Sequence, residues 1–525
     1  MSPATWLLRG LVAAAFCYLA LFVLRADIRN LINIVPDDAF YYLNIAENLA
    51  AHRGLTFDGT TPTNGFQPLW LYVLTGLFSV CDSSPETMFR LCLVLQIAML
   101  ACASCMLLAL GPPGRPSSFT WATAVIFVSL VVERAANGME SALLVLTLTA
   151  LLRYGSRTQV LKEFAFRRSL VFGLLLGLVM LSRLDTVFVG AAALGFALLT
   201  AIRRPESRGR ALVGSGGMAL GATAVVSPYL VFNQLEFGRV MPISGVLKSS
   251  FPVPSISFDA ILGLGHPMAA VVLACASISL CYVAWFAWKG RLMRRPHAHP
   301  HDAAMAILAA GVVLHFCYVL VFMRWAVFYW HFVPSMLFVS LAAGSHALHV
   351  RLWSRRPRVR NTFYWAAIVV AIGLGAANAH RRRSLPLDHG WHAAAYEAAL
   401  WAQRETTNED LFAMKDAGTF GFFSERDVVN LDGLVNGPGF QEVLRDKQLT
   451  PYLRSLGVRY LAQPISTLRG VPEGRYHSFS FRYHSHQYGV ESDGIVLRKS
   501  SEVYRSPPFS LSGRTAAFII WRLTE

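Results

Sequence analysis

The sequence predicts a polytopic α-helical membrane protein that carries a mixed α/β domain at its C-terminal end. The 525 residues are 54% hydrophobic and only 15% charged, with a mean hydropathy of +0.44. A soluble chain of this size needs more charge to cover its surface. The net charge of +16 would by itself suggest nucleic acid. The basic residues gather in short runs between apolar segments, however, and this arrangement is typical of cytoplasmic loops.

Eleven segments approach the roughly 20 apolar residues that a membrane-crossing helix requires. The first is predicted to be a retained helix, because no small-x-small cleavage site follows it. The predicted spans are 6–24, 88–110, 119–132, 141–152, 169–182, 184–202, 211–233, 267–289, 303–323, 325–350 and 362–377.

Loop charge sets the predicted topology. Four basic loops, at 153–168, 203–210, 289–295 and 351–360, are expected in the cytoplasm together with the N-terminus. The segment 68–81, "PLWLYVLTGLFSVC", is apolar but short, and if it crossed the membrane these loops could not all be cytoplasmic. We therefore expect it to be a helix at the outer surface. The loop with Asp37 and Asp38, and everything after about Ala379, then lies outside.

Two domains follow from this layout: a membrane module, 1–379, with a first outer loop at 25–87 that contains surface helices, and an exported α/β domain, 380–525. Periodicity in the second predicts a helix at 392–404 and strands at 410–414, 427–431, 459–463 and 516–522. The glycines within 415–440 indicate turns. All eight cysteines lie in or beside apolar segments without metal-type spacing, which indicates neither a zinc site nor a disulfide framework.

The adjacent carboxylates Asp37 and Asp38 are the strongest candidates for chemistry. They follow Pro36 and open the stretch "AFYYLNIAENLAAHRG", which reads as an amphipathic helix ended by Gly54. The plain alternative is a pair of solvated loop carboxylates. At a lipid–water border, however, such a group can deprotonate a hydroxyl while a lipid-linked leaving group stays in the membrane. Two close carboxylates also raise each other's pKa, which suits a base near neutral pH.

The stretch "DDAFYYLNIAENLAAHRGLTFDGTTPTNGFQPLW" resembles the first outer loop of the GT-C glycosyltransferases, polytopic enzymes that take sugars from polyprenyl-phosphate donors. It is most like the decaprenyl-phosphoarabinose-dependent arabinofuranosyltransferase branch. Two turns of that branch are matched by "NGMES" at 137–141 and "SRLD" at 182–185. The ending "TNGFQPLW" departs from the branch and leaves the donor sugar open. The resemblance implies that Asp37 is the base and that Asp38 holds a sugar hydroxyl or a metal, with the swapped roles as the alternative.

Further residues are expected to bind the donor phosphate or the reacting sugars. Each has a plain alternative role. Arg183 is equally well explained by a pair with Asp185 that closes their turn, and Lys248 by a solvated charge. The aromatic run around His331 is explained by an interface belt. The candidates for the donor phosphate are Arg183, Lys248, Arg239, Arg324 and His331. The candidates for substrate contact are Glu140, Asp185, Tyr41, Asn64, Gln67, Asp416, Asp432 and Asn436.

The sequence therefore predicts an inverting glycosyltransferase on the outer face of a bacterial inner membrane. It would move a sugar, arabinofuranose by the resemblance, from a polyprenyl-phosphate donor to a hydroxyl of a cell-envelope glycan, lipid or protein. The alternatives are a transporter or flippase and a non-catalytic glycan-assembly protein. The sequence shows no inverted repeat, which argues against a transporter. The sequence establishes no cofactor. A Ca, Mg or Mn ion stays open, since two carboxylates are too few ligands to argue for it. Nucleotide-binding motifs are missing from the sequence.

Overall fold

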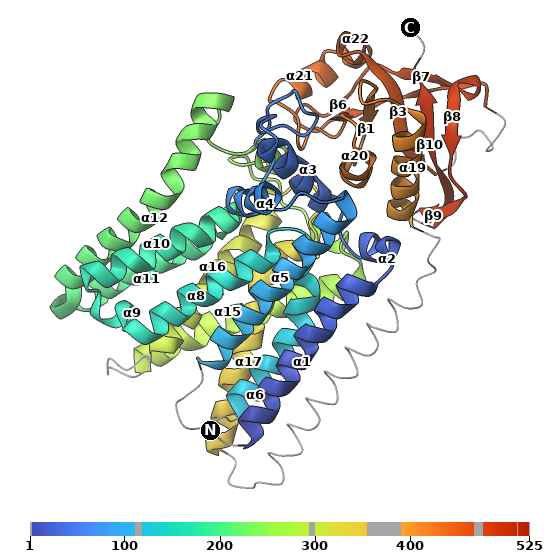
Figure 1. Ribbon diagram of the computed structural model, residues 1–525. Coiled ribbons are helices and arrows are strands. Elements are labelled where there is room, and N and C mark those ends of the chain that lie inside the picture. Colours follow the sequence, from blue (N-terminus) through green and yellow to red (C-terminus); the bar gives the residue numbers. More distant parts are fainter. Residues whose placement is uncertain are drawn as a thin grey trace.

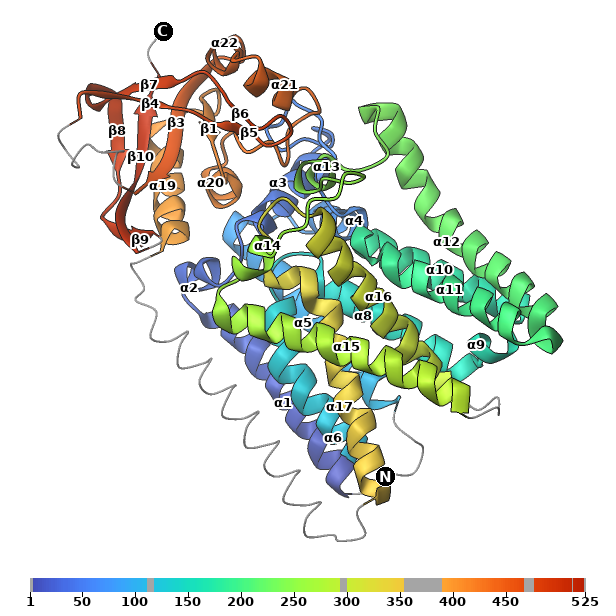
Figure 2. The ribbon, with the colours of Figure 1, turned by 180° about the vertical axis from the view of Figure 1, so that it is seen from behind.

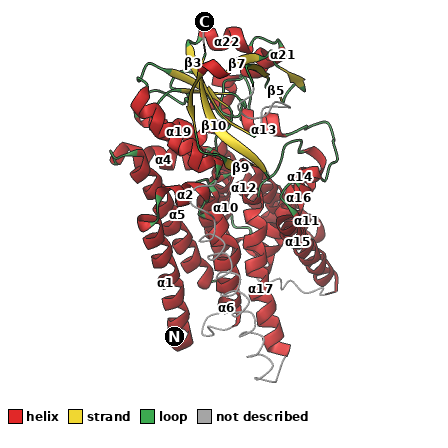
Figure 3. Cartoon of the chain, turned by 90° about the vertical axis from the view of Figure 1, so that its right-hand side faces the viewer, coloured by secondary structure: helices red, strands yellow, loops and turns green. Residues whose placement is uncertain are grey.

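The computed structural model describes residues 3–110, 118–292, 300–353, 390–466, 476–511 and 513–523. The chain forms a bundle of long helices with a β-rich domain seated on one end (Figure 1). Figure 3 shows that the strands of the sheet are confined to this C-terminal domain. Among the described residues, five helical stretches are long and apolar enough to cross a membrane: Pro85–Leu108, Leu184–Arg203, Pro205–Phe237, His266–Trp288 and His301–Phe322.

Each predicted span that the structure describes is helical over most of its length. The long helices are α1 (Pro3–Arg25), α5 (Pro85–Leu108), α6 (Ser118–Ile126), α8 (Ser141–Thr158), α10 (Phe166–Ser182), α11 (Val187–Arg203), α12 (Arg208–Phe237), α15 (His266–Leu292), α16 (Pro300–Phe322) and α17 (Val333–Trp353). A π-helical stretch, Phe127–Val132, and the short α7 (Glu133–Ala135) continue α6. The last of the helices starts later than predicted, because Tyr329–Phe332 is a separate 3-10 turn. The predicted span 362–377 and the domain border at 379 lie outside the described residues.

Three short helices precede α5 and lie where the bundle meets the C-terminal domain: α2 (Ile28–Asn33), α3 (Asp38–Ala50) and α4 (Pro68–Val80). The helix expected after the two aspartates is present, but it is not amphipathic in its first half, because every side chain from Ala39 to Ala46 is buried. Its predicted end is wrong, because α3 stops at Ala50 and Gly54 belongs to the following turn, with φ of 77°. Helix α4 has 13 residues and is therefore about 20 Å long. It is too short to span a membrane, and it lies beside α3 (Figure 1).

The C-terminal domain is built on a sheet with the strand order β2-β1-β3-β10-β8. Strand β1 (Leu411–Met414) pairs in parallel with β2 (Val428–Asn430) and β3 (Val458–Ile465). Strand β10 (Arg514–Arg522) runs antiparallel to β3 and β8 (Glu502–Arg505). The helix predicted at 392–404 is α19 (Trp391–Glu405), and the four predicted strands are present. The other elements are α21 (Phe440–Arg445), α22 (Leu449–Ser455), β9 (Phe509–Leu511) and the pairs β4–β7 (Ser478–Phe481, Ile495–Arg498) and β5–β6 (His484–Ser485, Val490–Glu491).

One expectation for this domain is wrong. The glycine-rich stretch after β1 is not only turns, because Gly418–Ser424 forms the helix α20. Its aromatic side chains pack on α3, and the rings of Phe40 and Phe423 lie 5.3 Å apart between centroids. Phe40 also meets Phe89 of α5 at 4.9 Å. The bundle and the domain thus share one apolar core, which fixes their relative position.

Candidate active site

The side chain of Asp37 is bound by the C-terminal domain. Its Oδ2 atom accepts a hydrogen bond of 2.8 Å from the Gly418 amide. Its Oδ1 atom accepts two from Thr419, at 2.8 Å from the amide and 2.7 Å from the hydroxyl. Asp37 therefore caps the first turn of α20 across the interface, as an N-cap carboxylate does within one chain segment. Burial raises the pKa of Asp37 to about 8, against the lowering effect of these hydrogen bonds.

The neighbouring side chain, Asp38, points into a cavity instead. This cavity has a volume of about 70 Å³ and is walled by α3, the 65–67 turn, the 139–140 turn, α13 (Ile243–Lys248) and residues Leu434 and Val435 of the C-terminal domain. Within the described part of the chain, nothing hydrogen-bonds to the Asp38 carboxylate. Burial raises its pKa, the positive charge of Lys248 lowers it, and the negative charge of Asp432 raises it through repulsion. Asp38 is a carboxylate with its oxygens free for a ligand.

Tyr41 and Tyr42, also on α3, link this helix by hydrogen bonds to the C-terminal domain and to the bundle. The Tyr41 hydroxyl donates to Asp432 Oδ2 at 2.9 Å and accepts from the Ala417 amide at 3.1 Å. The Tyr42 hydroxyl donates to Glu140 Oε2 at 2.9 Å. Helix α3 is therefore the element that organises the site, with one side chain toward the domain and the next toward the bundle.

Arg183 is enclosed between two carboxylates. Its Nη1 atom lies 2.9 Å from Glu140 Oε1, and its Nε atom lies 2.9 Å from Asp185 Oδ2. His315 Nε2 approaches Asp185 at 3.4 Å. A buried guanidinium with two carboxylate partners is already neutralised. The geometry favours the structural role of this "SRLD" turn, although Arg183 and Glu140 both line the cavity.

Lys248 also lines the cavity, but unlike Arg183 it has no carboxylate partners among the residues that the structure describes. It ends α13 and lines the cavity wall, and in the described ranges it forms no ion pair. Its carbonyl accepts a hydrogen bond of 3.0 Å from the Arg324 amide. The side chains of Arg239 and Arg324 do not line the cavity. His331 does, and its Nδ1 atom accepts from the Phe328 amide at 3.2 Å.

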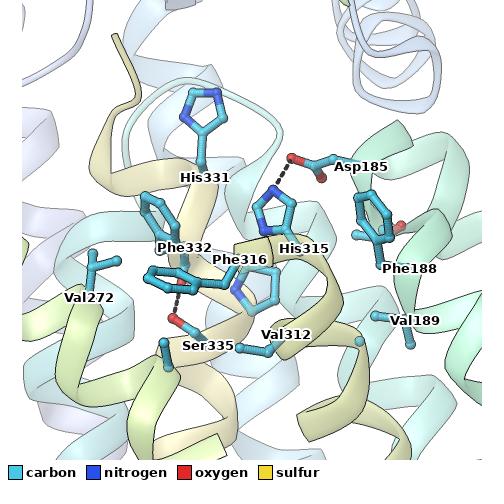
Figure 4. A pocket seen from close by; sticks show the side chains of 14 residues that line it. Asp185, Phe188, Val189, Val272, Val312, His315, Phe316, His331, Phe332 and Ser335 are labelled. Atoms are coloured by element: carbon cyan, nitrogen blue, oxygen red, sulfur yellow. Dashed lines mark hydrogen bonds and ion pairs between the residues drawn. The ribbon is translucent and has the colours of Figure 1, made fainter. Parts of the chain in front are cut away.

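A second, largely apolar cavity of about 20 Å³ adjoins the first and is lined by α11, α15, α16 and the start of α17. Figure 4 shows Phe332, Phe316, Val312 and Val272 around it, with the Asp185–His315 pair on one side. His331 lines both cavities. A polar chamber and an apolar chamber therefore meet at one side chain.

The arrangement of the whole chain matches known membrane proteins of the same fold. ArnT from Cupriavidus metallidurans, in a crystal structure bound to undecaprenyl phosphate, is 13% identical, with a TM-score of 0.53 over 99% of this chain and 98% of that chain. The chain has the GT-C membrane fold. The apo structure of the same ArnT is 14% identical, with a TM-score of 0.48 over 92% of this chain and 98% of that chain. A family model described as "Domain of unknown function (DUF8728)" matches residues 386–497. No curated protein matches.

Within this GT-C fold, several predicted contact residues are used for structure. Asn64 Oδ1 accepts from the Ile243 amide at 2.9 Å, and Gln67 Oε1 accepts from the Leu184 amide at 3.0 Å, although Gln67 also lines the larger cavity. Asp432 uses both oxygens, for Tyr41 and for the Leu434 amide.

Two more predicted residues lie on the C-terminal domain outside the cavity lining. Asn436 is buried and donates to the Asn430 carbonyl at 2.7 Å. Asp416 stands just before α20 with a positive φ of 51°. Desolvation, together with the negative charges of Asp432 and Asp38, raises its pKa to about 6.

The structure also brings in residues that the sequence did not indicate. Tyr42, Ser244, Trp330, Leu434 and Val435 line the larger cavity. For Tyr42 a signal was available, because it lies four residues after Asp38 and so shares its helix face. For Leu434 there was none, since its placement depends on the docking of the domain. In the described ranges, no three His, Cys, Asp or Glu side chains gather in a way that could hold a metal ion.

Proposed function

We propose that the protein is an inverting glycosyltransferase that moves a sugar from a polyprenyl-phosphate donor to an acceptor hydroxyl. The observation that carries this proposal is the pair of adjoining cavities, one polar and one apolar, that share His331. The polarity of such a pair matches an amphipathic donor, with its sugar and phosphate toward the polar chamber and its prenyl chain toward the apolar one. ArnT, a GT-C glycosyltransferase of the same fold, has been crystallised with undecaprenyl phosphate, which supports the same class of donor here.

We assign the catalytic base to Asp38 rather than to Asp37. Both oxygens of Asp37 are held by Gly418 and Thr419, so a substrate hydroxyl would have to displace the C-terminal domain to reach them. Asp38 faces the cavity with free oxygens and a raised pKa, the properties that a general base requires. Asp37 then acts as a positioning residue, because it fixes both the start of α3 and the domain that closes the cavity.

The phosphate contact is assigned to Lys248, with His331 beside it. A donor phosphodiester carries one negative charge, and one unpaired ammonium matches it. In the reaction, Asp38 accepts the proton of the acceptor hydroxyl while the oxygen of that hydroxyl forms a bond to the anomeric carbon. The bond from that carbon to the phosphate oxygen breaks, and polyprenyl phosphate leaves with the electron pair. Lys248 stabilises the charge that develops on the leaving phosphate. Attack opposite the leaving group inverts the configuration.

The finer features of the proposal rest on the resemblance of the sequence motifs. They are arabinofuranose as the sugar, a cell-envelope glycan, lipid or protein as the acceptor, and the outer face of a bacterial inner membrane as the location. The C-terminal domain, from about residue 380, would then lie outside the cytoplasm, and the N-terminus inside. Leu434 and Val435 close the cavity from this domain, so the acceptor must enter beside them.

The test is to delete the gene and to compare the sugars of surface polymers and proteins by mass spectrometry. We expect one glycan modification to disappear and to return with the wild-type gene, but not with Asp38→Asn. Asp82→Asn, an exposed carboxylate in the loop before α5, is the matched control and should restore it. Full restoration by Asp38→Asn would refute the base assignment. Counterflow of a lipid-linked solute without a glycosidic product would instead support a transporter.

A further inference from the structure

The segment that follows Lys248 exposes a row of apolar side chains. It comprises residues 249–262, here called the apolar arm, and includes the short helix α14 (Asp259–Leu262). No charged residue occurs from 249 to 258, "SSFPVPSISF". Five of its large apolar side chains are between 56% and 73% exposed: Phe251, Val253, Ile256, Phe258 and Leu262. A soluble loop rarely exposes a contiguous apolar row of this kind.

The backbone of the arm is fixed to the last turn of α16. Ser250 and Ser255 donate their amides to the carbonyls of Phe322 and Val321, both at 2.7 Å, and Ser257 donates to Leu320 at 3.2 Å. The last carbonyls of a helix otherwise lack partners, so these bonds satisfy both segments. The backbone of the arm is therefore fixed by hydrogen bonds, and its side chains point outward.

The arm lies at the membrane boundary, because it joins the ends of two membrane-length helices. It leads directly into α15, and it is bonded to the end of α16. Figure 2 shows α14 at the ends of these two helices that are nearest to the C-terminal domain. The exposed apolar side chains continue from the arm along α15, through Leu273 and Ile278, into the face that lipid covers. The exposed Arg324, whose amide bonds Lys248, stands beside it at the level expected for lipid phosphates.

We infer that the apolar arm inserts into the lipid leaflet on the side of the bundle that carries the C-terminal domain, with acyl chains as its partner. Backbone amides held by the end of α16 and an apolar outer row that is uncharged up to Phe258 favour entry into a bilayer interface. Because the arm starts directly after Lys248, its insertion also holds this lysine at the level of the lipid phosphates. The inference does not depend on the proposed transferase reaction.

The test uses the full chain in nanodiscs of phosphatidylethanolamine and phosphatidylglycerol, with the photo-crosslinker p-benzoyl-phenylalanine in place of Ile256 or, separately, of Leu262. The positive control places it at Leu280 of α15, which is 56% exposed, and the negative control at Val496 of β7, which is 62% exposed. We expect lipid adducts at positions 256 and 262 in yields close to that at 280 and about tenfold above that at 496.

Two results would overturn the inference. Adduct yields at 256 and 262 as low as that at 496 would show that water covers the arm. Crosslinks to a second copy of the chain, or to another protein in native membranes, in place of lipid would show that a protein surface covers it. Two positions are used so that a local disturbance by either crosslinker does not decide the outcome.

Discussion

Exchanging the carboxyl groups of Asp37 and Asp38 for amides, one at a time, should separate stability from catalysis. In Asp37→Asn, the amide oxygen can keep both bonds from Thr419, but the amide nitrogen then faces the Gly418 N–H across the 2.8 Å contact. A buried donor left without an acceptor costs about 1–3 kcal/mol. Asp38→Asn removes no hydrogen bond found in the structure, so its effect on stability should stay within about 0.5 kcal/mol.

Activity should change in the opposite order. Loss of a general base lowers a rate by about 10²- to 10⁴-fold, and this loss is expected only for Asp38→Asn. Asp37→Asn should keep the rate within about tenfold below its unfolding temperature, since it acts through position alone. The assays are thermal unfolding of the purified variants in detergent and recovery of the envelope glycan in the deletion strain. An inactive but fully stable Asp37→Asn, beside an active Asp38→Asn, would refute the reasoning and return the base to Asp37.

The remaining predictions concern the interface and the buried ion pairs. The pKa of Asp37 is about 8 in the fold and about 3.9 in an unfolded chain. The stability it contributes is therefore full below about pH 4 and falls by about 1.4 kcal/mol per pH unit up to about pH 8. Melting curves across this range should lose that slope in Asp37→Asn, and parallel slopes would contradict it. A Cβ at Gly418 would lie 2.2 Å from the Asp37 carbonyl oxygen, whereas one at Gly439 meets nothing within 4 Å. Gly418→Ala should thus destabilise by about 1–3 kcal/mol and Gly439→Ala should not, as chemical denaturation can show. Arg183→Gln removes the guanidinium that neutralises Glu140 and Asp185 and leaves them, among the described residues, only the contacts with Tyr42 and His315. It should cost about 3–5 kcal/mol, and an unchanged melting temperature would mean that these ion pairs carry no stability.

Much of the fold could be predicted because it depends on local sequence patterns. Apolar runs located the long helices, and the 3.6-residue period located α3. A difference in role between Asp37 and Asp38 could also have been predicted. Successive residues on a helix point about 100° apart, so two adjacent carboxylates at the start of α3 are expected to have different neighbours. Which of them faces the cavity was not predictable, because that depends on where α20 docks.

The rest of the site depends on contacts between residues that are far apart in sequence. Arg183 looked like a phosphate ligand because Glu140, which lies 43 positions away, gave no local sign of pairing with it. Helix α20 escaped prediction because its seven residues, "GTFGFFS", have two glycines and no clear period. Its helical state is stabilised by Asp37 at its first turn and by Phe40 on its aromatic face, and both partners belong to another domain.

The central claim, that the polar cavity holds a lipid-linked phosphate at Lys248, can be tested by native mass spectrometry of the purified protein with undecaprenyl phosphate. We predict one bound lipid per chain, binding lowered about tenfold or more in Lys248→Gln, and unchanged binding in Arg239→Gln, whose side chain lies outside the cavity lining. No bound lipid in the wild type, or equal binding by all three proteins, would contradict the account.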